Sequence, residues 1–170
     1  MISSPISLIK FRLATHVDLP ALEWNGEFTH FRQLFNDTFR QVTEMCALMW
    51  VIECHNSGII GQIFVQLNGH RTELADGVSR AYLYAFRVRP QYRNKGIGTR
   101  LMEVVETDLV KREYHSVTIN VARDNLGARR LYERLGYRVV VAEPGEWSYI
   151  DHLGQRQYVH EPAWRMEKDI

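Results

Sequence analysis

A loop that combines basic residues with two glycines is the segment of this sequence whose residue types most clearly suggest chemistry. Between positions 87 and 100 the chain carries five arginine or lysine residues and no acidic residue, and Gly96 and Gly98 lie among them. The loop joins a predicted strand to a predicted helix, so unpaired N–H groups and the positive end of the helix dipole would meet there. Glycine also lets a backbone approach a ligand closely. The segment therefore predicts an anion site that suits a pyrophosphate.

Two widespread phosphate-binding patterns do not fit this loop. A Walker loop requires Gly-Lys-Ser/Thr, whereas Gly98 is followed by threonine and arginine. A dinucleotide fingerprint requires a third glycine where Leu101 stands, and an acidic residue where Asn120 stands. What remains is the segment Arg93-Asn94-Lys95-Gly96-Ile97-Gly98 after a strand.

A second motif lies one predicted helix and one predicted strand downstream. Residues 125–137 read Asn-Leu-Gly-Ala-Arg-Arg-Leu-Tyr-Glu-Arg-Leu-Gly-Tyr. Together, the two segments resemble the pyrophosphate loop (Arg/Gln-x-x-Gly-x-Gly/Ala) and the second motif (Asn-x-x-Ala-x-x-Leu-Tyr-x-x-x-Gly-Phe/Tyr) of the GNAT N-acetyltransferase superfamily. The resemblance is strongest from about residue 81 to residue 141.

The resemblance implies an α/β fold with a mixed, mostly antiparallel, splayed central sheet of six or seven strands flanked by about four helices. It implies a single N-acetyltransferase domain over residues 1–170, with the cofactor-binding core at about 81–141. Such a protein transfers an acetyl group from acetyl-CoA to a primary amine of a small molecule or peptide. The amine attacks directly in a ternary complex, without a metal, and a homodimer is a further suggestion of the resemblance.

The same resemblance assigns roles to individual residues. Backbone atoms near Phe86 to Val88 would pair with pantetheine, and the N–H of Val88 or its neighbour would stabilise the oxyanion. Backbone N–H groups from 93 to 99 would hold the pyrophosphate. Tyr132 would be the general acid, although it also lies on the apolar stripe of its helix and suits a core position. The expected cofactor-binding residues are Phe86, Arg87, Val88, Arg93, Asn94, Lys95, Gly96, Ile97, Gly98, Thr99 and Asn125.

The general base is not identified by the sequence. Many members of the superfamily have a glutamate on the central strand, but residues 81–88 contain no acid. Glu44, Glu53, Asp151 and His160 are candidates, each equally typical of a surface or ion-paired residue, and a water chain is an alternative. The missing acid also leaves open a non-catalytic acyl-CoA-binding sensor or interaction module.

Composition narrows the classes of function. The 170 residues contain 21 Lys and Arg against 20 Asp and Glu, and this net charge of +1 predicts no general affinity for nucleic acid or anionic membranes. Cys46 and Cys54 fit reduced core thiols, and neither they nor the histidines have metal-ligand spacing. The N-terminus has no signal-peptide pattern, and no apolar run reaches membrane-spanning length. We therefore expect a cytoplasmic protein.

Hydrophobic periodicity places the motifs on strands and helices. Strands are expected at 9–13, 47–53, 59–67, 81–88, 117–121, from 139 onward and at 158–166. Helices are expected at 18–24, 31–42, 97–109 and 125–135. Within the strand at 81–88, Tyr82, Tyr84, Phe86 and Val88 are expected to share one face. The aromatic C-terminal region, which includes Trp147, is expected to pack on the sheet and in part to line an acceptor pocket that favours an apolar or aromatic acceptor.

Overall fold

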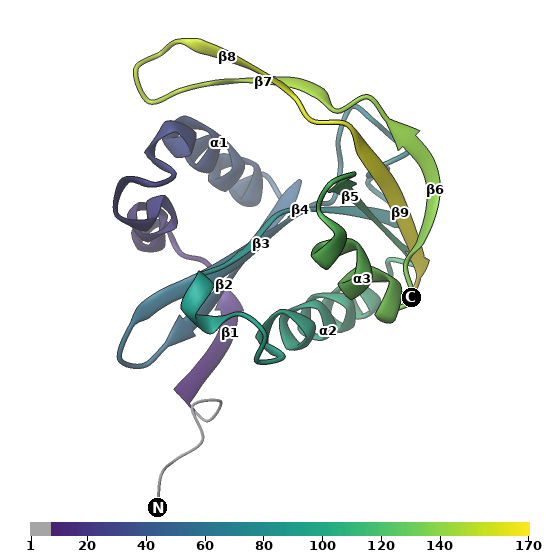
Figure 1. The fold of residues 1–170 in the computed structure, drawn as a ribbon, viewed down its shortest axis with the longest axis horizontal. Helices are drawn as coiled ribbons and strands as arrows, with labels where there is room; N and C mark the ends of the chain where they lie inside the picture. Colours follow the sequence, from purple (N-terminus) through teal and green to yellow (C-terminus); the bar gives the residue numbers. More distant parts are fainter. Residues whose placement is uncertain (1–7) are drawn as a thin grey trace, which may run out of the picture.

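A computed structural model describes residues 8–170, which form a seven-stranded sheet and a separate two-stranded hairpin (Figure 1). The order of the large sheet is β1-β2-β3-β4-β5-β9-β6. All its neighbouring strands are antiparallel except β4 and β5, which are parallel. The expected mixed, mostly antiparallel sheet is thus confirmed. The strands are β1 (Ile9–Leu13), β2 (Ala47–Cys54), β3 (Gly58–Gln66), β4 (Arg80–Val88), β5 (Ser116–Ala122), β6 (Arg138–Glu143), β7 (Glu146–Ile150), β8 (Arg156–His160) and β9 (Ala163–Asp169).

Helices cover both faces of this sheet (Figure 1). The α-helices are α1 (Arg32–Thr43), α2 (Ile97–Lys111) and α3 (Leu126–Arg134), and the 3-10 segments are η2 (His16–Gly26), η3 (Thr29–Phe31) and η4 (Pro90–Tyr92). On α2, Ile97, Leu101, Val105 and Leu109 recur every four residues and are all buried, so this helix packs its apolar stripe on one face. Helix α1 packs on the opposite face, where Phe35 is fully buried. No helix among the described residues is long and apolar enough to cross a membrane.

Strands β4 and β5 separate halfway along their length. They pair only from Arg80 opposite Ser116 to Leu83 opposite Ile119, although both strands continue beyond these pairs. Ala85 has a left-handed backbone (φ +52°), and the register between β4 and β3 shifts at the same point. Such a bulge bends its strand and increases the local twist. The bulge therefore accounts for the splayed sheet, which leaves backbone groups of both strands unpaired along the gap.

The bulge also changes which side chains share a face of β4. Before it, Ala81 and Leu83 belong to the core beneath α2 and α3, and after it Phe86 and Val88 pack against that same core. Tyr84 packs on the α1 side. The expectation that Tyr82, Tyr84, Phe86 and Val88 share one face is therefore wrong, because the extra residue at Ala85 interrupts the two-residue alternation.

Three further expectations need correction. The predicted helix at 18–24 is a 3-10 segment, with left-handed backbone at Trp24 and Asn25, although Thr15 and Asp18 do form the cap at its start. The predicted strand from 139 onward is divided into β6 and β7, and the predicted final strand at 158–166 is divided into β8 and β9. Pro162 lies between β8 and β9, where it cannot donate a ladder hydrogen bond.

The hairpin of β7 and β8 extends from the far edge of the sheet to α1 (Figure 1). The ring of Tyr149 lies 4.9 Å from that of Phe31 and 6.1 Å from that of His30, and the ring of Trp147 lies 6.3 Å from that of Phe31. These contacts join the C-terminal hairpin to the start of α1. They enclose a space on the α1 face of the sheet, directly over the gap between β4 and β5.

The left-handed backbone at Ala85 predicts opposite effects of glycine at two positions of β4. An alanine in this conformation is strained, so Ala85→Gly should raise the free energy of unfolding by up to about 1 kcal/mol. Ala81→Gly, in regular and fully buried strand, should lower it by about 1 kcal/mol or more. Denaturant unfolding measures both values, and a destabilisation of equal size at the two positions would contradict the strain assigned to Ala85.

Candidate active site

A cavity of about 720 Å³ lies where β4 ends, α2 begins and α3 faces them. Its wall contains every expected cofactor-binding residue except Lys95, and it also contains Tyr132. Two motifs that are separate in the sequence therefore meet around one space. Five further residues line it, and sequence reasoning assigned them no role: Tyr92, Gly127, Ala128, Leu131 and Arg134. The spacing of Ala128 and Leu131 from Asn125 on one helical face was the signal that could have identified those two.

The loop from Arg93 to Thr99 presents unpaired amides to this cavity. Asn94 (φ +59°) and Gly96 (φ +75°) have left-handed backbone, and α2 begins directly after them. The first helical hydrogen bond runs from the N–H of Arg100 to the carbonyl of Gly96 at 3.1 Å. The four N–H groups from residue 96 to residue 99 consequently have no acceptor within the helix. With the positive end of the helix dipole, they form an environment that suits an anion.

The two glycines of the loop meet different requirements. A Cβ atom at Gly98 would lie 3.1 Å from the Phe86 ring, so this glycine lets the ring pack closely on α2. At Gly96 a Cβ would meet no atom within 4 Å, so the requirement there is the left-handed backbone itself. Arg93 fastens the loop to the end of β4, because its Nε donates a 2.7 Å hydrogen bond to the carbonyl of Val88.

Tyr132 and Tyr137 are both buried, but their hydroxyl groups differ. The Tyr137 hydroxyl donates a hydrogen bond to Oε1 of Glu106 at 2.8 Å, which marks a structural role. The Tyr132 hydroxyl has no hydrogen-bond partner within residues 8–170, and the residue lines the cavity. Burial raises the pKa of Tyr132, so its hydroxyl stays protonated around neutral pH and can donate a proton.

Asn125 has a structural task besides any contact with a ligand. Its Oδ1 accepts a 3.1 Å hydrogen bond from the N–H of Ala128 and so caps the start of α3. Asn125 also lines the cavity. The position of the helix and the wall of the cavity thus depend on the same side chain.

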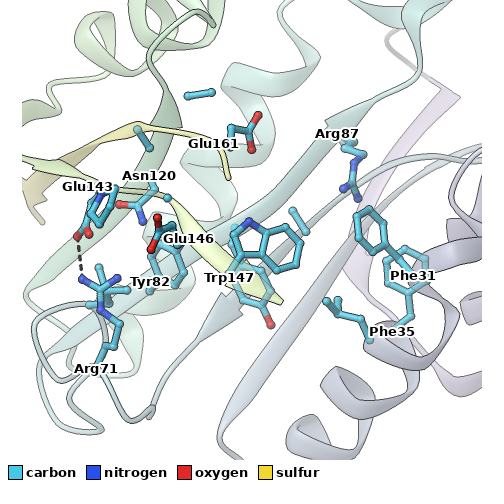
Figure 2. Close-up of a pocket in the computed structure, with 18 residues that line it drawn as sticks. Phe31, Phe35, Arg71, Tyr82, Arg87, Asn120, Glu143, Glu146, Trp147 and Glu161 are labelled. Carbon is cyan, nitrogen blue, oxygen red and sulfur yellow. Dashed lines mark hydrogen bonds and ion pairs between the residues drawn. The ribbon is translucent and has the colours of Figure 1, made fainter. Parts of the chain in front are cut away.

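A second cavity, of about 430 Å³, lies on the α1 face beneath the C-terminal hairpin (Figure 2). Figure 2 shows Phe31, Phe35 and Trp147 on one part of its wall, and Tyr82 with Asn120 on another. Tyr82 stacks on Tyr84 with ring centres 5.6 Å apart, and burial raises the pKa of Tyr82 to about 12. Arg87 lines both cavities, which therefore lie next to each other at β4, beside its gap with β5.

The carboxylates of the second cavity come from the C-terminal segment, but they are not Asp151, the acidic residue that the sequence analysis considered there. Glu143 is buried and paired with Arg71 at 2.8 Å and Arg165 at 3.2 Å, so its charge is compensated. Glu146 and Glu161 line the same wall and are exposed. Glu146 follows Pro144 and Gly145, and Glu161 precedes Pro162, so neither residue belongs to a periodic pattern that would mark it in the sequence. Within residues 8–170 no three His, Cys, Asp or Glu side chains are arranged to hold a metal ion.

None of the four residues considered as a general base lines this second cavity. Glu53 pairs with Arg12 at 2.9 Å on the opposite side of the molecule from the hairpin. Asp151 accepts backbone hydrogen bonds from the turn between β7 and β8, which hold its pKa below its usual range. Glu44 follows α1, and His160 lies on β8 beside Glu146. These four are therefore surface or structural residues.

The chain thus combines a splayed, mostly antiparallel sheet with an amide-lined loop at the end of its central strand. A sequence model of the Acetyltransferase (GNAT) family matches residues 15–137. This match covers well over half of the chain, so the chain belongs to the GNAT family of acetyltransferases.

Individual relatives agree with this membership. N-alpha-acetyltransferase 40 of Saccharomyces cerevisiae is 32% identical over 123 residues, which are 64% of this chain and 43% of that protein. The match thus spans less than half of that relative. Ard1 of Thermoplasma volcanium superposes with a TM-score of 0.72 at 18% identity, covering 96% of this chain and 98% of the other. Arabidopsis thaliana NAA60 in complex with acetyl-CoA gives 0.68 at 22% identity, covering 95% and 98%. Both structures show a shared fold.

The loop geometry predicts that Gly96→Ala weakens acetyl-CoA binding about tenfold, because alanine resists the left-handed backbone that positions the amides. Gly154→Ala is the matched control, since Gly154 also has a positive φ and open space around it but lies in the hairpin turn. Titration calorimetry measures both affinities. Equal affinities for the two variants would show that the loop backbone does not hold the cofactor.

Proposed function

We propose that this protein is an N-acetyltransferase that transfers the acetyl group of acetyl-CoA to a primary amine of a small molecule or peptide. The observation that carries the proposal is the position of two neighbouring cavities at the splayed strands, with the amide-lined loop beside one and an aromatic enclosure around the other. Family membership supports acetyl transfer. The names of the yeast relative and of the Arabidopsis complex support an amine acceptor and acetyl-CoA.

The cofactor would lie along the end of β4. Its pyrophosphate would accept hydrogen bonds from the amides of residues 96–99, and pantetheine would extend beside Phe86 to Val88. The N–H of Arg89 binds the carbonyl of Ile60 on β3 at 2.8 Å. Because neighbouring residues of a strand direct their N–H groups to opposite sides, the N–H of Val88 is directed into the gap toward β5. This supports Val88 as the donor to the oxyanion.

The chemical step requires two proton transfers. The amine nitrogen attacks the thioester carbonyl carbon, the oxyanion forms beside Val88, and the C–S bond then breaks as the amide forms. The thiolate leaving group takes a proton from the Tyr132 hydroxyl, which is protonated at rest because burial raises its pKa. The tyrosinate then regains a proton from solvent, which restores Tyr132 for the next turnover. The proton lost by the amine would leave through water in the second cavity, past the exposed carboxylates of Glu146 and Glu161.

Removal of the proposed acid should slow turnover without abolishing cofactor binding. We expect Tyr132→Phe to lower kcat for thiol release about 100-fold, with acetyl-CoA affinity nearly unchanged. Tyr137→Phe is the control, because it removes a buried hydroxyl that is bonded to Glu106. It should lower stability by about 1 kcal/mol and leave kcat within about twofold.

Full activity of Tyr132→Phe would exclude the acid role. A wild-type protein that binds acetyl-CoA but releases no thiol with any amine of a broad panel would instead indicate a non-catalytic acyl-CoA sensor. These two outcomes are distinguishable, because thiol is released if only the acid role is wrong, whereas a sensor releases no thiol at all.

Trp147 predicts an apolar or aromatic contact with the acceptor. Trp147→Ala should raise the acceptor KM about tenfold, because the indole forms part of the cavity wall and closes it against Phe31. Tyr158→Ala is the control on the same hairpin, since Tyr158 is 81% exposed and does not line this cavity. An unchanged acceptor KM in Trp147→Ala would rule out this contact.

A further inference from the structure

Arg87 is a charged residue in an apolar surrounding, and its position follows from the bulge in β4. Residues 86–88 border the first cavity, and the side chains of Phe86 and Val88 pack against the core beneath α2 and α3. The Arg87 side chain points the other way, beside Phe31 on the wall of the second cavity (Figure 2). It therefore faces the space proposed for the acceptor and not the anion-binding loop.

Aromatic rings hold the guanidinium in place without neutralising it. Its Cζ lies 4.3 Å from the ring centre of Phe28 and 5.3 Å from that of Phe31. Within residues 8–170 it has no ion pair and no hydrogen bond, and its Nη1 is buried. By contrast, Arg71 on the far wall of the cavity pairs with two carboxylates. Burial lowers the pKa of Arg87 to about 10, which still leaves it charged at neutral pH, and Glu27 acts on it only from a distance.

An uncompensated charge at such a position requires an explanation, because desolvating a guanidinium is unfavourable unless an anion pairs with it. Packing between two phenyl rings does not require a charge, since a methionine would fill the same space. The pyrophosphate of the cofactor is not the missing anion, because its amides lie at residues 96–99 on the other side of β4. The anion is therefore expected to arrive with the acceptor.

We propose that Arg87 is a specificity-determining residue that pairs with a carboxylate which the acceptor carries close to its reactive amine. This inference rests on the proposed function. The planar guanidinium can donate two parallel hydrogen bonds to a carboxylate, while the aromatic wall contacts the body of the acceptor. Two sources supply this chemistry: the α-carboxylate of a free amino acid, and the side-chain carboxylate of an acidic residue at a peptide N-terminus.

Matched pairs of acceptors test the proposal by thiol release. One arm compares L-amino acids, L-phenylalanine among them, with their amides, and the other compares C-terminally amidated tripeptides that begin with Asp or Asn. In one of the two arms, the wild-type kcat/KM should be about 10- to 100-fold higher for the acceptor with the carboxylate than for its neutral partner. The arm that shows this ratio identifies whether the carboxylate belongs to a free amino acid or to an N-terminal acidic residue. Arg87→Met should abolish this ratio, and Arg87→Lys should retain only part of it.

Arg89→Met is the matched control. Arg89 is two residues away, is half-buried and stacks on Trp24 at 5.1 Å, but it lines neither cavity. Arg89→Met should keep the wild-type ratio of kcat/KM within the preferred acceptor pair. Acetyl-CoA affinity, measured by calorimetry, should be unchanged in Arg87→Met.

Four results would overturn the inference: equal rates within both acceptor pairs, no turnover of any carboxylate-bearing acceptor, a wild-type ratio in Arg87→Met, or a loss of acetyl-CoA binding in Arg87→Met. The ratio within the wild-type pairs does not depend on the folding of any variant. A wild-type protein that fails to bind acetyl-CoA would instead overturn the proposed function itself.

Discussion

The divergence of β4 from β5 is the constraint on which the proposed site depends. The two strands pair up to Leu83 and Ile119, and beyond that point each has backbone groups without a strand partner. In a continuous sheet those groups would bind one another and no ligand would have room. The bulge at Ala85 separates the strands, so the gap leaves donors such as the Val88 N–H without a strand partner.

Two kinds of polar group without a partner lie near this gap, and they lack a partner for different reasons. The amides at the start of α2 are unpaired because every helix leaves its first N–H groups free, so they need no special sequence beyond a loop that exposes them. Arg87 is unpaired because its neighbours are phenyl rings and not carboxylates. Helix geometry explains the first kind fully. The second kind has only cation–π contacts with Phe28 and Phe31, and a ligand that brings an anion would supply the pairing that these rings do not.

Sequence reasoning succeeded where the determinant was local. The loop with Gly96 and the motif with Tyr132 predicted residues that the fold brings together around one cavity, because each motif encodes its own turn and helix start. The strands and helices with clear periodicity were also located correctly. The bulge at Ala85 was missed because nothing in the alternation of 81–88 marks an extra residue, and the face assignment of Phe86 failed with it.

The acceptor side could be predicted only in part, since it is assembled from distant segments. Phe31 at the start of α1, Arg87 on β4 and Trp147 on the hairpin become neighbours only through the sheet order. The cofactor side depends instead on one continuous loop and the helix that faces it. Substitutions in the hairpin or at position 87 can therefore change the acceptor while the amides at 96–99 stay in place. This separation predicts that acceptor choice and acetyl-CoA affinity vary independently in this fold.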